Sequence, residues 1–348
     1  MSACASAFPS ERCLEPIIEP PDPAALGLEI ETLVRTRTLL EHGPYRVVAG
    51  KGRHLPNCLH EIGRLREITF RAVGEGTGQA IDLDRFDEHY EHVMVYDQAA
   101  GQIVGAYRAG ATDEILPRQG LDGLYTATLF DLDPALFDRW GPALELGRSF
   151  IRPEHQRVRN VLPLLWRGIA RLVARQPRYR RLFGPVSISQ SYGRFAQQLI
   201  AATLSRIHGA LDLAPLARPR IPLTPLRPGQ TDQLPQTVRE LTDRLTAEAG
   251  TRTDLPVLLK HYLKLGGRLL SFNVDPAFSN VVDGLIVVDL LHTKPRLRRL
   301  YFGEANDSAF IDYHDQQPNS DSAPDLPTES QVRTITGTPP EVGRSAGG

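Results

Sequence analysis

Residues 143–176 read ALELGRSFIRPEHQRVRNVLPLLWRGIARLVARQ, and this stretch decides the fold. The run ALELGRSFIRP predicts a strand, and NVLPLLWRGIARLVARQ predicts a helix with Pro163 in its first turn, where proline is tolerated. A second strand, LFGPVSIS, and a second helix, YGRFAQQLIAATLSRIHG, follow. A strand, loop and helix repeated in this order predict a βαβα unit with two parallel strands.

The segments on either side extend this unit. Upstream, HEIGRLREITFRAV has helical spacing and ends in the glycine-rich loop of residues 74–78. HVMVYDQAAGQIVGAYRAG then predicts a hairpin whose second strand ends at Arg108. Downstream, a proline-rich segment leads into two short helices ending at Gly266 and into the strands RLLSFNV and GLIVVDLL. We therefore predict one catalytic domain over residues 43–305.

The two ends of the chain differ from this domain in composition. Residues 1–42 combine prolines with one short amphipathic run, LGLEIETLV, which predicts a partly disordered leader or linker. Residues 306–348 are rich in Ser, Asp, Pro, Gly and Thr and contain few apolar residues, which predicts a disordered tail.

The composition as a whole is that of a globular protein, with 41% hydrophobic residues, 23% charged residues and a formal net charge of −1. The three cysteines have no partner histidines at zinc-ligand spacing, so we predict neither a disulfide framework nor a metal site. No apolar run approaches the roughly 18 residues of a membrane span. We expect a cytoplasmic protein that binds no nucleic acid, and a peripheral contact with the inner membrane face remains open.

Arginines are concentrated in one segment, residues 148–181, which holds ten of them and one acidic residue. We expect this segment to meet an anion, because the N–H groups at the start of its helix also suit a phosphate. The candidate donor-binding residues are Gln156, Arg157, Arg159, Asn160, Arg167 and Arg171. Arg167 and Arg171 share one helix face with Arg175, and a solvated helix face is the alternative interpretation.

Longer blocks of the sequence resemble a known family. The blocks are GRLREITFRAVGEGTG, IDLDRFDEHY, IVGAYR, ALELGRSFIRPEHQ, LLWRGIARLVAR, LFGPVSIS and PVLLKHYLKLGGRLLSFNVDPAFSNVVDGLIVVDL. Over about residues 44–303 they resemble the hemolysin-like branch of the GNAT acyltransferases, which includes the ornithine N-acyltransferases of ornithine-lipid synthesis. The resemblance implies an α/β fold with a mixed, strongly twisted sheet, helices on both faces, and a C-terminal extension of helices and strands.

A more distant similarity links the chain to the acyl-homoserine-lactone synthases. The ordered residues that carry it are Arg66, Phe70, Asp84, Asp87, Arg108, Glu145 and Arg148. In such families the donor is an acyl carrier protein thioester and the acceptor is the amine of an amino acid or a derivative. The resemblance thus implies an N-acyltransferase with acyl carrier protein as partner and no tightly bound cofactor. The loop QRVRNVL lacks the glycines of many acetyltransferases, which favours a phosphopantetheine arm over an acyl-CoA.

Three residues form the candidate catalytic set. Glu145 is the candidate general base for the attacking amine, and the alternative is an ion pair with Arg148. A bulge at Gly147 would let these two side chains share one face of the strand. Tyr192, after the second parallel strand, is the candidate acid that protonates the leaving thiolate.

A second set of residues is expected to bind the acceptor. Arg66 and Arg108 would hold a carboxylate, and Asp84 and Asp87 would hold a cationic group, with Phe70 as a further contact. Helix capping and surface pairing are the alternatives for the two aspartates.

The implied reaction is direct transfer of a fatty acyl or 3-hydroxyacyl group to an ornithine-like amine, with an apolar tunnel beside the sheet for the acyl chain. Two rivals remain open. One is an N-acetyltransferase that uses acetyl-CoA and a small amine. The other is a non-catalytic module that binds a carrier protein or an anionic membrane through the same arginines.

Overall fold

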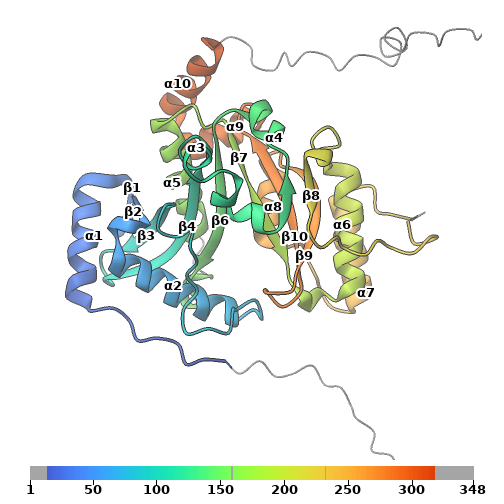
Figure 1. Ribbon diagram of the computed structural model, residues 1–348, viewed down its shortest axis with the longest axis horizontal. Coiled ribbons are helices and arrows are strands. Elements are labelled where there is room, and N and C mark those ends of the chain that lie inside the picture. The colour runs from blue at the N-terminus through green and yellow to red at the C-terminus, as the bar shows by residue number, and fades with distance from the viewer. Residues whose placement is uncertain (1–13, 158–159, 232, 318–348) are drawn as a thin grey trace, which may run out of the picture.

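The computed structural model describes residues 14–157, 160–231 and 233–317, and a single eight-stranded sheet runs through it (Figure 1). Its strands lie in the order β1-β2-β3-β4-β6-β7-β10-β9. They are β1 (Thr38–His42), β2 (Tyr45–Lys51), β3 (Glu91–Asp97), β4 (Gln102–Ala111), β6 (Ala143–Ile151), β7 (Arg181–Ile188), β9 (Arg268–Asp275) and β10 (Val281–Asp289). Two short strands, β5 (Phe130–Leu132) and β8 (Ala217–Pro219), form a separate antiparallel pair.

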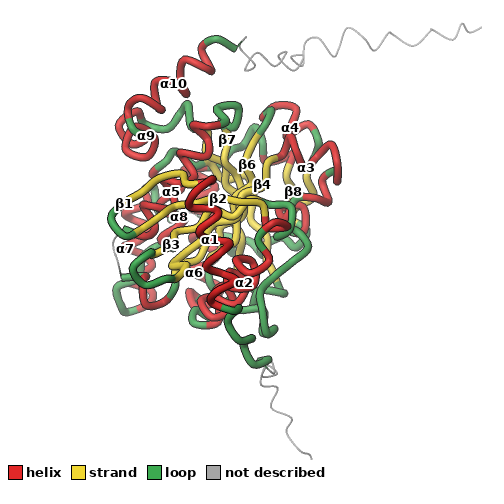
Figure 2. Tube along the Cα trace, turned by 90° about the vertical axis from the view of Figure 1, so that its left-hand side faces the viewer, coloured by secondary structure: helices red, strands yellow, loops and turns green. Residues whose placement is uncertain are grey.

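Helices cover both faces of the large sheet (Figure 1, Figure 2). They are α1 (Pro23–Arg37), α2 (Pro56–Arg71), α3 (Thr112–Gln119), α4 (Ala135–Trp140), α5 (Val161–Arg175), α6 (Arg194–His208), α7 (Val238–Ala249), α8 (Val257–Lys264), α9 (Pro295–Phe302) and α10 (Glu304–Asp315). Side chains of β2 and β3 alternate between the faces, because successive strand residues point to opposite sides. Val47 and Val93 pack against Gly168 of α5, whereas Val48 and Met94 pack against α1 and α2. The predicted mixed sheet with two covered faces is confirmed.

The central strands β6 and β7 are parallel, as the sequence predicts, but they are paired over a short distance. Their register runs from Ala143 opposite Arg181 to Glu145 opposite Phe183 and goes no further in the described chain. A Cβ atom at Gly184 would lie 2.1 Å from the carbonyl oxygen of Leu146, so the strands still touch there. Beyond this point the described residues of the two strands are not paired with each other, and we call this unpaired stretch the opening between β6 and β7.

The C-terminal segment completes the other half of the sheet. β10 pairs antiparallel with β7 from Val282 opposite Ile188 to Asp289 opposite Arg181, and β9 pairs with the outer side of β10. The strands of the predicted extension are therefore part of the same sheet. They lie next to β7, on the side away from β6.

Both predicted domain boundaries need correction. Residues 1–42 are not a leader throughout, because α1 and β1 belong to the fold and Ile30 is only 2% exposed. Residues 306–348 are not a tail throughout, because α10 buries Phe310 to 1% exposure. One or two apolar residues per helical turn are enough to hold a helix in the fold when apolar side chains of other elements are present for them to pack against. Residues 1–13 and 318–348, also part of those predicted segments, lie outside the described residues.

Two smaller observations concern boundaries and membranes. Strand β4 continues past Arg108 to Ala111, because Ala109 and Gly110 pair with Leu146 and Glu145 of β6. In the described ranges, no helix has both the length and the apolar character needed to cross a bilayer.

Candidate active site

A β-bulge in β6 shapes the site. Ala106 of β4 lies opposite Phe150, and two residues on Arg108 lies opposite Gly147, so β6 carries one extra residue in this interval. Arg148 takes up the bulge with φ of +49°, a left-handed conformation that costs of order 1–3 kcal/mol for a non-glycine residue. The sequence predicted a bulge at Gly147, and the positive φ falls on its neighbour.

A buried cluster of three arginines and three aspartates lies beside this bulge, and we name it the Arg–Asp cluster. Its members are Arg66, Arg108, Arg148, Asp82, Asp84 and Asp87. Arg66 Nη1 lies 2.7 Å from Asp87 Oδ1, and Arg108 Nη1 lies 2.6 Å from Asp84 Oδ1 and 3.0 Å from Asp87 Oδ1. The charges balance, which offsets the large cost of burying them.

The cluster corrects part of the predicted acceptor site. Arg66 is 0% exposed and binds Asp82 and Asp87, and Arg108 is 1% exposed and binds Asp84 and Asp87 through Nη1. Nε and Nη2 of Arg108 are buried without a hydrogen-bond partner among the described residues. Burial therefore keeps both guanidinium groups from a substrate carboxylate in this conformation, and Asp84 and Asp87 bind arginines in place of a cationic acceptor. Phe70 packs against the apolar cluster between α1, α2 and the sheet. Of the residues predicted as substrate-binding, Asp84 contacts Arg148 directly. Arg66, Asp87 and Arg108 pair with one another or with Asp84.

Titration of the cluster follows from burial and charge. Burial by itself would raise the pKa of Asp87, but Arg66 and Arg108 outweigh it and hold the pKa well below its usual range. Burial also lowers the pKa of His92 to about 4, and its ring nitrogen lies 2.9 Å from the carbonyl oxygen of Asp87. At neutral pH Asp87 is thus ionised beside a neutral histidine.

Glu145 lies next to the cluster but faces a turn. Its carboxylate accepts hydrogen bonds from the Tyr90 hydroxyl, from the Thr126 backbone and hydroxyl, and from Tyr125 N at 3.2 Å. The turn η3 (Tyr125–Thr128) is thereby fixed against the sheet. Glu145 is 1% exposed, and burial raises its pKa. The alternative ion pair with Arg148 is wrong, and direct proton abstraction by Glu145 would require these hydrogen bonds to break.

Arg148 is the most exposed of the three arginines of the cluster, with 9% of its side chain accessible against 1% for Arg66 and Arg108. Its guanidinium reaches Asp82 at 3.4 Å and Asp84 at 3.6 Å, and its carbon lies 5.1 Å from the ring centre of Tyr125 and 4.3 Å from that of Phe278. Both rings come from segments far from Arg148 in the sequence, so sequence reasoning missed them. The two aromatic faces fix the direction of the arginine.

A cavity of about 520 Å³ opens beside the carboxyl end of β7. It is lined by Ala72, Val73, Glu75, Ser187, Ser189, Ser191, Tyr192 and Pro256. The Tyr192 hydroxyl donates a hydrogen bond to the carbonyl oxygen of Asp254 at 2.6 Å. Burial and the nearby carboxylates of Asp254 and Glu75 raise the pKa of Tyr192, and burial raises the pKa of Glu75 as well. The predicted Tyr192 therefore faces a polar, acidic cavity.

Asp283 is a second acid that sequence reasoning missed. It lies on β10, is 3% exposed, and accepts a hydrogen bond from Ser187 Oγ at 2.7 Å. Burial raises its pKa to about 7, assisted by the charges of Asp275 and Glu75. The available signal was an acidic residue inside the apolar run NVVDGLIVVDLL. Such a residue on a buried strand is a candidate for function.

The predicted donor-binding residues fall into two separate places. Gln156, Arg157 and Asn160 lie in the exposed loop before α5, while Arg159 lies outside the described residues. Among the described residues no side chain caps the start of α5 at Asn160, and the first N–H groups of an α-helix have no partner within the helix itself. Arg167 and Arg171, by contrast, line a groove of about 430 Å³ with Arg175, residues 39–41 and Asn306.

The arginine segment is more neutral than its sequence suggests. Of the nine arginines of this segment that the structure describes, five form ion pairs with acids, most of which come from elsewhere in the chain: Arg148, Arg152, Arg178, Arg180 and Arg181. Arg178 pairs with Asp113 at 2.8 Å, for example, and Arg180 pairs with Asp289 at 2.7 Å. The surface available to an anion is therefore smaller than the predicted one.

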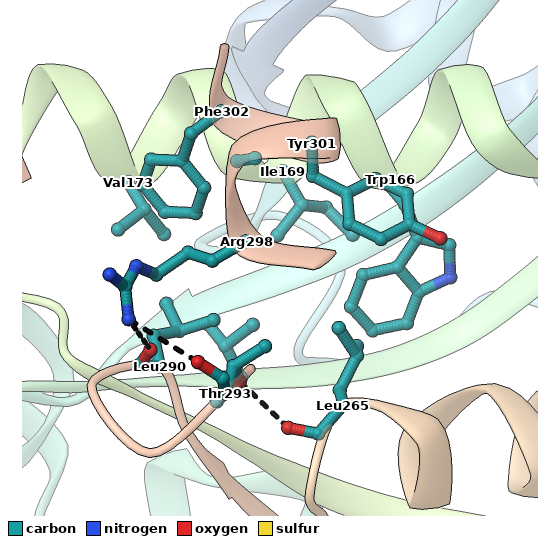
Figure 3. A pocket seen from close by; sticks show the side chains of 11 residues that line it. Trp166, Ile169, Val173, Leu265, Leu290, Thr293, Arg298, Tyr301 and Phe302 are labelled. Atoms are coloured by element: carbon teal, nitrogen blue, oxygen red, sulfur yellow. Dashed lines mark hydrogen bonds between the residues drawn. The ribbon is translucent and has the colours of Figure 1, made fainter. Parts of the chain in front are cut away.

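An apolar cavity lies between α5, α9 and the sheet (Figure 3). Trp166, Tyr301 and Phe302 line it, and Arg298 closes one side by donating hydrogen bonds to the carbonyl oxygens of Leu290 and Thr293 at 3.3 Å. Its volume is about 20 Å³, room for roughly one water molecule. In this conformation it is too small to be the predicted acyl tunnel.

Comparison with known proteins gives this geometry a context. Residues 65–167 match the acetyltransferase (GNAT) domain family. Over 275 residues the chain is 30% identical to a glycine N(alpha)-acyltransferase of Phocaeicola vulgatus, covering 76% of this chain and 78% of the relative. Over 254 residues it is 28% identical to an L-ornithine N(alpha)-acyltransferase of Agrobacterium fabrum, covering 69% of this chain and 78% of the relative.

A solved structure, that of a CoA-dependent acyl-homoserine lactone synthase, is also similar. The likeness covers 74% of this chain and 96% of the other, at 13% identity and a TM-score of 0.36. A TM-score this low is too weak to support an inference about chemistry.

Proposed function

Because this chain belongs to the GNAT N-acyltransferases, we propose that it transfers a fatty acyl or 3-hydroxyacyl group from an acyl carrier protein thioester to the amine of an amino acid. Relatives named for glycine and for L-ornithine support an amino acid as the acceptor. An ornithine-like acceptor would yield the N-acyl amino acid of an ornithine lipid, and glycine is the second candidate.

The divergence of β6 and β7 beside the polar cavity is the observation that carries this proposal. Strands that separate leave backbone N–H groups without strand partners, and such groups can polarise a thioester carbonyl. The donor arm would enter the opening from the α5 side, and the amine would approach from the cavity. Direct attack needs no covalent enzyme intermediate, because orientation of the two substrates supplies much of the rate.

Two predicted catalytic residues fit this arrangement. Arg148 is held by Asp82 and Asp84 and directed by Tyr125 and Phe278, so it can contact the acceptor carboxylate at the edge of the cavity. Tyr192 lines the cavity and would protonate the leaving thiolate after releasing the Asp254 carbonyl. In this proposal Glu145 is a positioning residue, because its carboxylate fixes the turn that carries Tyr125.

The choice of donor rests on those arginines of residues 148–181 that form no ion pair with an acid among the described residues. An acidic carrier protein would meet Arg157 in the loop before α5 and Arg167 and Arg171 on the helix. The loop without glycines is less suited to a CoA pyrophosphate, which needs close approach of the backbone.

A direct assay tests the proposal. Purified protein is incubated with long-chain acyl carrier protein, long-chain acyl-CoA or acetyl-CoA, each with glycine or ornithine, and the products are identified by mass spectrometry. We expect an N-acyl amino acid from the carrier protein donor. An acetylated amine formed from acetyl-CoA alone would favour the acetyltransferase, and carrier binding without any product would favour the non-catalytic module.

A further inference from the structure

The cavity beside β7 carries an acid and hydroxyl pair that the proposed reaction has not yet used. Ser187 lines the cavity and lies directly opposite Asp283 in the pairing of β7 with β10. Ser187 Oγ donates to Asp283 Oδ1 at 2.7 Å. Among the residues that the structure describes, none donates a hydrogen bond to Oδ2 of Asp283. The carboxylate therefore has spare acceptor capacity, unlike that of Glu145.

We propose that the Ser187–Asp283 pair accepts the proton of the acceptor amine and that Glu75 holds the ammonium form before transfer. This inference rests on the proposed acyl transfer and names the acceptor half of its site. Glu75 lines the same cavity from the loop after α2, opposite the end of β7. A primary ammonium group has three N–H donors, so it can bind Glu75 and Ser187 together.

The charged groups around Asp283 suit this role. Asp275 at the end of β9 and Glu75 in the loop after α2 are acidic, Arg148 of β6 is basic, and Tyr125 of the turn η3 also faces Asp283. Burial, with the two carboxylates, raises the pKa of Asp283 to about 7. A base is most effective when its pKa lies near the working pH, so Asp283 is matched to neutral conditions.

The proton inventory of the step balances. The ammonium nitrogen gives one proton to Ser187 Oγ, and the serine proton passes to Asp283 Oδ1. The free amine attacks the thioester carbonyl carbon, a C–N bond forms, and the C–S bond breaks. Tyr192 protonates the leaving sulfur, which departs as a thiol, and the second nitrogen proton restores the Tyr192 hydroxyl. The third proton stays on the amide, and Asp283 later releases its proton to solvent.

Two substitutions test the pair. Asp283→Asn and Ser187→Ala should each lower kcat by about 100-fold, the usual contribution of a positioned base, while donor binding measured by thermal shift stays unchanged. The double variant should be no slower than either single variant, because the two groups act as a unit. Ser271→Ala is the matched control, since this half-buried serine of the neighbouring strand β9 donates to the carbonyl oxygen of Ala217 and does not line the cavity, and its kcat should equal that of the parent.

The pH profile separates a proton acceptor from a structural residue. The parent kcat/KM should fall below about pH 7, and Asp283→Asn should lose this inflection and follow the ionisation of the acceptor amine, near pH 8 to 10. Glu75→Gln should raise the KM for the acceptor about 10-fold with little change in kcat, because it removes binding of the ammonium rather than proton transfer.

The outcomes distinguish this inference from the function on which it rests. If the parent forms no N-acyl product with any donor, the proposed function fails and the inference fails with it. If the parent is active and both single variants retain its rate and its inflection near pH 7, the inference alone is overturned. If Asp283→Asn does not fold, the kcat of Ser187→Ala decides, because this substitution leaves the carboxylate of Asp283 in place. A fall of about 100-fold supports the inference, and an unchanged kcat overturns it.

Discussion

Replacing the shared aspartate of the Arg–Asp cluster should destabilise the protein far more than the same chemical change at its surface. Asp87 accepts hydrogen bonds from Arg66 at 2.7 and 2.9 Å, from Arg108 at 3.0 Å and from the backbone of Asp84 at 2.8 Å. Asp87→Asn removes its charge and leaves three buried arginines facing two aspartates. Removing one partner of a buried ion pair costs about 3–5 kcal/mol, and we expect a loss of that size.

The control is Glu154→Gln. Glu154 lies 3.0 Å from Arg152, but its side chain is 56% exposed, so water screens the pair and the expected loss is below about 1 kcal/mol. The free energy of unfolding of both variants is measured by urea unfolding followed by circular dichroism. The values are compared when its slope with urea concentration is the same for both. A loss below about 1 kcal/mol for Asp87→Asn, or one equal to that of the control, would refute the reasoning.

The sign of the pH dependence can be stated in advance. The pKa of Asp87 is lowered in the folded state, so its contribution to stability is complete above the unfolded value of about 4. That contribution is lost only as the pH falls through the lower folded value. The difference between the parent and Asp87→Asn should therefore be constant from pH 6 to 8 and shrink in acid.

Three further predictions concern activity. Glu145→Gln should lower turnover by about 100-fold together with the melting temperature, because glutamine keeps one acceptor oxygen and turns an NH2 group towards either the Thr126 or the Tyr90 donors. Unchanged melting with lost activity would instead make Glu145 the base. Tyr192→Phe should slow transfer about 10-fold with ordinary thioesters but not with donors whose thiol is more acidic, and equal slowing with both would exclude protonation of the thiolate. The double variant Arg167→Glu and Arg171→Glu should impair use of an acyl carrier protein more than use of an acyl-CoA, and added salt should have the same effect on the parent; equal loss with both donors would argue against carrier docking.

Much of the fold could be read from the sequence because local pattern sets local structure. The helices α2 and α5, the hairpin of β3 and β4, and the parallel order of β6 and β7 all follow from periodicity and turn residues. The boundaries at α1 and α10 could not be read in this way. Their few apolar side chains become informative only when the elements that receive them are known, which are the sheet and α2 for α1 and the helices α5 and α9 for α10.

Through its resemblance to known acyltransferases, the sequence also indicated the kind of reaction, and it predicted a site at the ordered residues from Arg66 to Arg148. Only the tertiary structure decided what each of them touches. Arg66 and Arg108 bind aspartates, and Glu145 holds a turn. The acid bonded to the cavity-lining Ser187 is Asp283, which lies more than 130 residues further along the chain than Glu145. The physical reason is that electrostatic and hydrogen-bonding partners are chosen by distance in space, and burial sets their strength, whereas the sequence reports only distance along the chain.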